Sequence, residues 1–99
     1  MRKFETLDPI VHAPIRLAIL TVLISVKSAD FTYLRDVTDT TDGNLGTHLQ
    51  KLEDAGYVKV AKSFVSKKPK TTLSITKSGR KAYESYVKGI SGYLKRTSD

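Results

Sequence analysis

The side chains that could carry out chemistry are few in this sequence, and they are not grouped as a catalytic site requires. There is no cysteine, and the two histidines, His12 and His48, lie far apart along the chain. Two isolated histidines form neither a nucleophile–base pair nor a metal site, and no glycine-rich loop of the phosphate-binding kind is present. We therefore expect no enzyme, no metal ion and no cofactor.

Three aspartates, Asp36, Asp39 and Asp42, recur at every third position. Such a cluster could hold a cation weakly. The aspartates also surround a polar turn at residues 39–42, and side chains of this kind cap the free N–H groups at the start of a helix. Capping of two helices is the preferred interpretation.

Basic side chains are concentrated in the second half of the chain. Residues 51–99 contain twelve Lys and Arg against four Asp and Glu, whereas residues 1–50 contain five against six. Such a distribution attracts polyanions, nucleic acid above all, and the alternative is a solvated basic surface without a dedicated partner. The longest apolar stretch, residues 17–26, is about half the length that spans a bilayer. We therefore expect a soluble, cytoplasmic protein without a membrane segment.

The first elements follow from the distribution of apolar residues. Asp8 and Pro9 predict the start of a helix, with Asp8 as its cap, and Pro14 interrupts or restarts it. From Pro14 to about Ser25 the chain is almost wholly apolar, which predicts a central helix covered on several sides.

Two helices are predicted on either side of the polar turn. Thr32 is expected to cap a short helix that ends near Val37, with Leu34 and Val37 facing inward. A longer helix should follow at about 43–55, and Gly56 should end it as a left-handed cap. The core stripe of this longer helix consists of Leu45, Leu49 and Leu52.

The hydrophobic period then changes from that of a helix to that of a strand. Alternation predicts two strands, from about 57 towards 65 and over 71–76, joined by the basic turn 66–70, where Pro69 should prevent regular ladder pairing. A long helix should begin at Thr76 or Ser78 and end near Arg96. Two short helices around a polar turn, followed by a basic hairpin, are typical of a helix-turn-helix with a wing.

These segments resemble the small winged-helix transcriptional regulators of the MarR/ArsR kind. The resemblance extends from about Leu7 to Leu94 and is strongest over TDGNLGTHLQKLEDAGYV at 41–58. It implies a mostly helical α+β fold with a three-helix core, a β-hairpin wing and a long C-terminal dimerisation helix. The expected single domain occupies 1–99, with the helix-turn-helix at about 31–56, the wing at about 57–76 and the last helix at about 77–96.

The resemblance also implies sequence-specific binding of double-stranded DNA by a homodimer, with the third helix in the major groove. The sequence departs from it in two respects. Metal-sensing members use cysteine clusters, which this chain lacks. A small polar side chain is expected where Gly46 stands, and glycine costs about 1 kcal/mol inside a helix. Either the backbone approaches DNA closely at Gly46, or the helix is simply weaker.

Angular position on the third helix selects the expected DNA contacts. Asn44 and Gln50 can pair with adenine, Thr47 can contact a base or a phosphate, and Lys51 a phosphate or guanine. The alternative is an ordinary polar surface. His48 lies at the edge of the leucine stripe, where packing is the preferred role, as for His12. The DNA-binding candidates are Thr41, Gly43, Asn44, Thr47, His48, Gln50, Lys51 and, from the wing, Lys62, Lys67, Lys68 and Lys70.

The last predicted helix has more apolar surface than one small domain needs. We expect the surplus to pack against a second copy, and the alternative is that it packs wholly onto its own subunit. The dimer candidates are Phe4, Leu7, Ile10, Val11, Tyr83, Tyr86, Val87, Ile90, Tyr93 and Leu94.

Two functions remain open at this point. The first is a dimeric DNA-binding regulator that represses transcription by steric occlusion. The second is a winged-helix module for protein–protein contact in the transcription machinery. The wing lysines favour the first, because a protein-docking wing does not need them. A small-molecule effector is compatible with the first, and the sequence identifies none.

Overall fold

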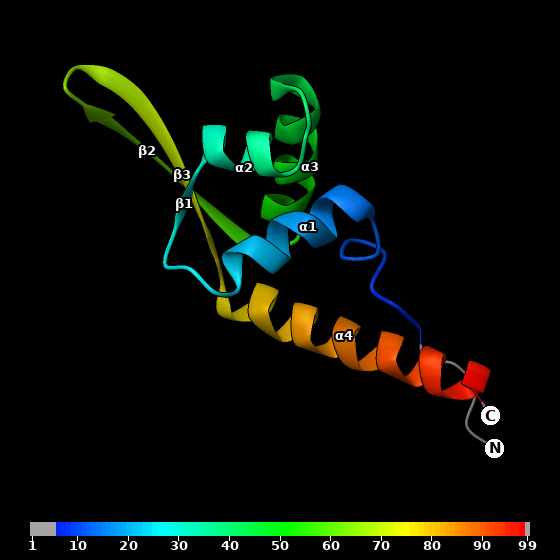
Figure 1. The fold of residues 1–99 in the computed structure, drawn as a ribbon. Coiled ribbons are helices and arrows are strands. Elements are labelled where there is room, and N and C mark those ends of the chain that lie inside the picture. The colour runs from blue at the N-terminus through cyan, green and yellow to red at the C-terminus, as the bar shows by residue number, and fades with distance from the viewer. Residues whose placement is uncertain (1–5, 99) are drawn as a thin grey trace.

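The structure is a computed structural model that describes residues 6–98, with side chains described as far as residue 95. Within this range, the fold consists of four helices and a three-stranded antiparallel sheet whose hairpin projects from the helices (Figure 1). The elements are α1 (Pro14–Leu23), β1 (Ala29–Asp30), α2 (Phe31–Val37), α3 (Asp42–Asp54), β2 (Val58–Val65), β3 (Lys68–Ile75) and α4 (Lys77–Ser98). The strand order is β1-β3-β2.

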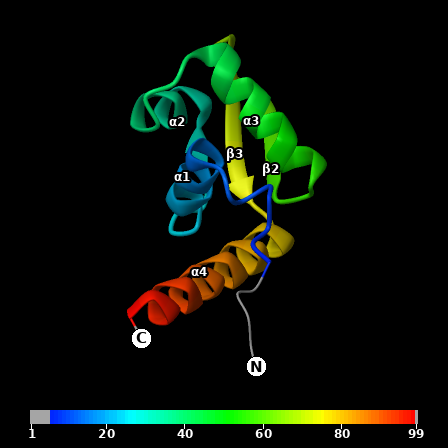
Figure 2. The ribbon, with the colours of Figure 1, turned by 90° about the vertical axis from the view of Figure 1, so that its right-hand side faces the viewer.

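The hairpin of β2 and β3, which we call the wing, and α4 extend from the helical body in opposite directions (Figure 1). The molecule measures 59 × 25 × 21 Å as a result. Turned by 90°, the fold shows α1, α2 and α3 on one side of α4, with the strands behind α3 (Figure 2). In the part of the chain that the structure describes, no helix is long and apolar enough to cross a membrane.

One hydrophobic core joins all of these elements. Helix α1 lies at its centre and contacts α3, α4 and β3, as its apolar sequence predicts. The predicted leucine stripe of α3 is buried against it. The buried core residues are Val11, Ile19, Leu20, Leu23, Ala29, Leu34, Leu45, Leu49, Leu52, Val58, Leu73 and Tyr86.

The N-terminal segment is a turn and not the predicted helix. The side chain of Asp8 does cap it, because its Oδ1 accepts the N–H of Ile10 at 2.8 Å. The carbonyl of Asp8 then accepts the N–H of His12 at 2.8 Å. Pro14 has no N–H to continue this turn, so the first helix begins at Pro14.

Around α2, the structure differs from the prediction in three respects. Ala29 and Asp30 form a short strand that pairs with Leu73 and Thr72 of β3. Helix α2 begins at Phe31 and has no side-chain cap, so Thr32 lies inside it. Val37 is 47% exposed, because the helix ends there and the chain turns out of the core.

The turn of the wing is shorter than predicted. Only Ser66 and Lys67 connect the strands, and both have positive φ, at 50° and 66°, as a type I′ turn requires. Pro69 lies within β3, opposite Phe64, so the expected break in pairing is absent. A two-residue turn closes on a hydrogen-bonded pair, and the next pair in an antiparallel ladder is not bonded. Pro69 occupies that next pair, where it has no ladder bond to lose.

The junction between α3, the wing and α4 is held by a single threonine, as one of the two predicted helix starts implies. Thr76 caps α4, because its Oγ1 accepts the N–H of Gly79 at 2.9 Å. The same hydroxyl donates to the carbonyl of Gly56 at 2.6 Å. Gly56 has a φ of 79°, which confirms the left-handed end of α3. The end of α3 and the start of α4 are thereby fastened together.

Candidate nucleic-acid interface

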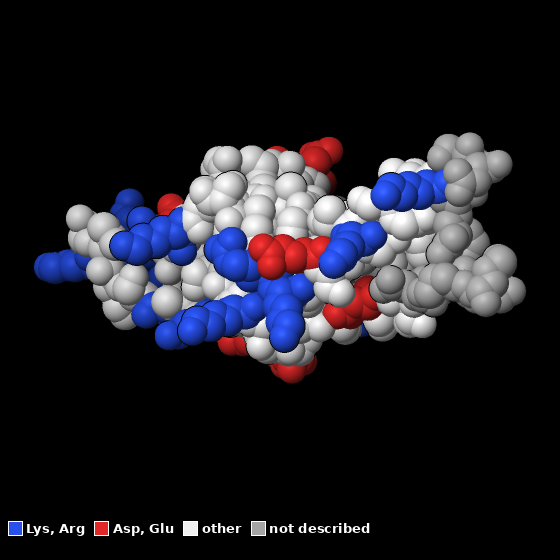
Figure 3. All heavy atoms as spheres, turned by 90° about the horizontal axis from the view of Figure 1, so that it is seen from below, with Lys and Arg blue, Asp and Glu red and all other residues white. Residues whose placement is uncertain are grey.

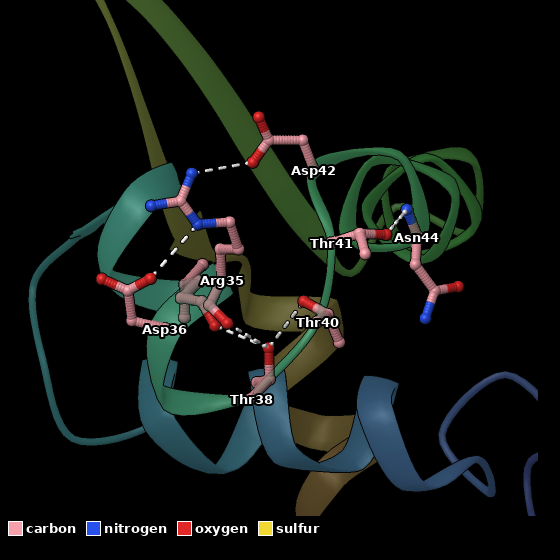
Figure 4. Close-up of polar contacts among 8 residues, drawn as sticks. Arg35, Asp36, Thr38, Thr40, Thr41, Asp42 and Asn44 are labelled. Atoms are coloured by element: carbon pink, nitrogen blue, oxygen red, sulfur yellow. Dashed lines mark hydrogen bonds and ion pairs between the residues drawn. The ribbon is translucent and has the colours of Figure 1, made fainter.

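The turn between α2 and α3 is built by threonines (Figure 4). Thr38 Oγ1 donates to the carbonyl of Leu34 at 2.6 Å and lies 3.1 Å from Thr40 Oγ1. Thr41 caps α3, since its Oγ1 accepts the N–H of Asn44 at 3.1 Å. Thr41 therefore sets where α3 starts, and its side chain is exposed at that end of the helix.

Two of the three aspartates near this turn, Asp36 and Asp42, pair with an arginine, and the side chain that caps α3 is Thr41, which corrects the sequence interpretation (Figure 4). Arg35 Nη1 donates to Asp42 Oδ1 at 2.9 Å, and its Nε donates to Asp36 Oδ1 at 3.2 Å. These bonds, the one to Asp42 first, raise the pKa of Arg35. Among the described residues, no group of three or more His, Cys, Asp or Glu side chains could hold a metal ion.

Helix α3 turns a polar face to solvent opposite its leucine stripe. Asn44, Thr47, Gln50 and Lys51 are all exposed. Thr47 Oγ1 donates to the carbonyl of Gly43 at 3.0 Å. Gln50 Nε2 donates to Asp54 Oδ1 at 2.8 Å, a surface bond that a contact to a base would replace. The predicted base-contacting residues are therefore together on one accessible helix face.

His48 lies on the flank of α3 that faces α1. Arg16 Nη1 lies 3.0 Å from His48 Nδ1. Because a guanidinium only donates, Nδ1 accepts, and the ring proton of the neutral form is on Nε2. Desolvation, followed by the charges of Arg16 and Lys51, lowers the pKa of His48. Arg16 was not among the residues expected at this site, and its Nε also donates to the carbonyl of Ile10 at 2.7 Å.

The other histidine joins the N-terminal turn to α4. His12 Nδ1 lies 2.8 Å from the hydroxyl of Tyr86, and their rings are 5.7 Å apart. A second contact has the same effect, since Tyr57 O–H donates to Asp8 Oδ2. That bond, together with burial, raises the pKa of Tyr57 to about 12. Both contacts hold the N-terminal turn onto the body of the domain.

The side chains towards the tip of the wing are exposed to solvent. All of residues 61–70 are exposed, among them Lys62, Lys67 and Lys68. Lys70 is also exposed, and its Nζ lies 3.7 Å from Asp30 Oδ1. Phe64, which was not among the expected site residues, is 76% exposed near the tip of the wing. Its place at the end of an alternating strand, beyond the core, is the signal that could have identified it.

Basic side chains gather towards the wing end of the molecule. Viewed from below, many of the Lys and Arg atoms lie at this end, whereas few acidic atoms do (Figure 3). A groove of about 500 Å³ separates the wing from α3. Its walls include Gly46, Gln50 and Glu53 of α3 and Lys62 and Thr71 of the wing. The polar face of α3 and the basic wing therefore flank one groove.

Comparison with known families decides the classification of this fold. Residues 15–94 match the family described as winged helix DNA-binding domain. The chain belongs to this family. This winged helix protein is 38% identical, over 78 residues, to an uncharacterized protein of Methanocaldococcus jannaschii, covering 79% of this chain and 85% of that protein.

Solved structures agree with this classification. The transcriptional regulator homologue from Pyrococcus horikoshii OT3 is 30% identical and superposes with a TM-score of 0.82, over 89% of this chain and 87% of that one. A MarR family regulator from Silicibacter pomeroyi shares the fold at 15% identity, with a TM-score of 0.67, over 89% of this chain and 58% of that one. The winged helix protein is thus a DNA-binding transcriptional regulator, a class whose members are not enzymes.

Proposed function

We propose that this regulator binds duplex DNA sequence-specifically as a homodimer and represses transcription by occluding the promoter. The observation that carries the proposal is the exposed polar face of α3 beside a lysine-rich wing. Such a helix reads base edges in the major groove, while a wing contacts the flanking backbone or minor groove.

The base contacts are assigned to the exposed polar face of α3. Asn44 and Gln50 each have the paired donor and acceptor that match adenine, and Thr47 suits a base edge or a thymine methyl group. Lys51 supplies a positive charge for a phosphate or guanine. Glu53 and Asp54 lie at the C-terminal end of α3, where we expect them to stay away from the phosphates. We assign His48 a packing role and no base contact, because its Nδ1 is already bonded to Arg16.

The dimer contact is assigned to α4. Val87 and Leu94 lie seven residues apart, on the same side of the helix, and are 44% and 66% exposed. Other apolar candidates are half-buried, namely Leu7, Ile10, Tyr83, Ile90 and Tyr93, and the first four also pack against the core of their own subunit. Two of the dimer candidates are not part of the proposed contact, because Val11 is fully buried and Tyr86 is 8% exposed in the core of their own subunit. Phe4 lies outside the described residues.

Fluorescence anisotropy tests the proposal with a duplex from upstream of the protein's own gene and an unrelated duplex of equal length. We expect tighter binding to the upstream duplex that persists at physiological salt. Thr47→Ala and Asn44→Ala should each cost about 1–3 kcal/mol of this preference while leaving the fold intact. Equal affinity for both duplexes, or variants that bind like the wild type, would contradict sequence-specific recognition. No binding even at low salt would favour a protein partner instead.

A further inference from the structure

Gly46 has no structural reason to be glycine within this subunit. It lies inside α3, where glycine destabilises a helix relative to alanine. A Cβ atom built at Gly46 would meet nothing within 4 Å. Its φ is not positive either, unlike that of Gly56. Neither packing nor backbone conformation therefore explains why a side chain is absent.

The surroundings of Gly46 indicate what the missing side chain leaves room for. Gly46 and Gln50 are one turn apart on the flank of α3 that lines the groove towards the wing. Lys62 and Thr71 line the opposite wall, from β2 and β3. Glu53, about two turns further along α3, is an acidic side chain that lines the groove as well.

The geometry of a DNA duplex indicates what would occupy the groove between α3 and the wing. One sugar–phosphate strand separates each major groove from the neighbouring minor groove. If α3 enters the major groove and the wing reaches the next minor groove, that strand must cross the mouth of the groove between them. Lys62 offers this sugar–phosphate strand a positive charge. The helix dipole of the N-terminal half of α3 also attracts the strand. Glu53 would repel the strand from the other end, which places the crossing near Gly46.

We propose that Gly46 is where the backbone of α3 approaches this sugar–phosphate strand most closely. This inference rests on the proposed DNA-binding mode and adds one contact to it. A side chain at Gly46 would hold the strand away from the backbone of α3 and from Lys62. Since the sugar–phosphate backbone is the same in every sequence, the contact contributes to affinity for all duplexes and not to discrimination among them.

The experiment combines Gly46→Ala and Gly46→Leu with Gly92→Ala as the matched control. Gly92 lies inside α4, and a Cβ there also meets nothing within 4 Å. Both alanine variants should therefore raise the melting temperature by a few degrees, about 2–8 °C. This increase verifies that Gly46→Ala is well folded before its DNA binding is measured.

The binding measurement uses the upstream and the unrelated duplex at low salt. Gly46→Ala should weaken binding to both by a factor of about 10–100, as one extra carbon in a close contact does, and Gly46→Leu by more. The ratio of the two affinities should not change, and Gly92→Ala should bind like the wild type. Wild-type affinity of both Gly46 variants, or a change in the ratio alone, would overturn the inference.

The failure of the inference is distinguishable from the failure of the proposed function. If Thr47→Ala loses the preference for the upstream duplex while the Gly46 variants bind normally, the recognition mode stands and the close approach is wrong. If the wild type shows no preference, or Thr47→Ala keeps it, the recognition mode itself is wrong. A loss of affinity in the Gly46 variants would then still locate a duplex against α3.

Discussion

Arg16 of α1 donates a hydrogen bond of 3.0 Å to Nδ1 of His48 on α3, across 32 residues of sequence. The same arginine donates to the carbonyl groups of Ile10 and Pro9, at 2.7 and 3.3 Å. One guanidinium thus links the N-terminal turn and α3 to the central helix. The bond to α3 requires a neutral His48, because Nδ1 must accept.

Acidification should weaken the fold through His48. The pKa of His48 in the folded protein is lowered from 6.5, so the folded state binds fewer protons than the unfolded state between the two values. The stabilisation is therefore complete above pH 6.5 and is lost as the pH falls towards the lowered pKa. Urea unfolding should show that the free energy of unfolding falls less between pH 7.5 and pH 5 for His48→Gln than for the wild type. The amide oxygen of the glutamine still accepts from Arg16, but the amide does not titrate. An NMR titration midpoint of His48 at or above 6.5 would contradict this.

Gly79→Ala should be strongly destabilising, in contrast to the glycines of open helix faces. A Cβ at Gly79 would collide with the carbonyl oxygen of Tyr57, which already accepts the N–H of Thr76 at 3.0 Å. Because the opposing atom is backbone, the start of α4 must shift away from the wing. We expect a loss of about 3 kcal/mol in the free energy of unfolding, measured by urea denaturation. A Gly79→Ala variant as stable as the wild type would rule out this close packing.

The wing lysines should determine the salt dependence of DNA binding. If Lys68 neutralises a phosphate, Lys68→Gln should reduce the slope of log affinity against log salt by about 0.9. Lys70→Gln should have a smaller effect, since Lys70 lies 3.7 Å from Asp30. Lys88→Gln makes the same change of charge on the exposed surface of α4 and serves as the control. Identical slopes for Lys68→Gln and Lys88→Gln would exclude the wing from the interface.

Leu94→Glu should dissociate the proposed dimer without unfolding the subunit. Leu94 is 66% exposed in the isolated chain, so a charge there costs little until a second copy covers it. We expect the dimer dissociation constant to rise at least about 100-fold, measured by sedimentation equilibrium. Val26→Glu, at a 43% exposed apolar position outside α4, should remain dimeric. A monomeric wild type, or a Leu94→Glu dimer of normal affinity, would disprove the assignment of α4.

Features that depend on neighbouring residues could be predicted from the sequence. The spacing of Leu45, Leu49 and Leu52 placed one face of α3 in the core, and the structure buries all three. The same spacing placed the polar residues of α3 on the opposite face, which the structure leaves exposed. Gly56 and Thr76 marked the end of one helix and the start of another, because the left-handed conformation and the capping hydroxyl are local chemistry.

Features that depend on distant residues were decided by the tertiary structure. Ala29 and Asp30 become a strand only because Leu73 and Thr72 lie beside them. Pro69 is compatible with the ladder because of its register opposite Phe64, which is set by the turn at Ser66 and Lys67.

The sequence by itself determined the order of the four helices and the hairpin, the core stripe of α3 and the basic charge of the wing. The tertiary structure decided that Arg16 holds His48, that Arg35 pairs with Asp42, and that Gly46 opens onto the groove facing Lys62. The physical reason is that periodicity and capping act over a few residues, whereas these pairings need chain segments that only folding brings together.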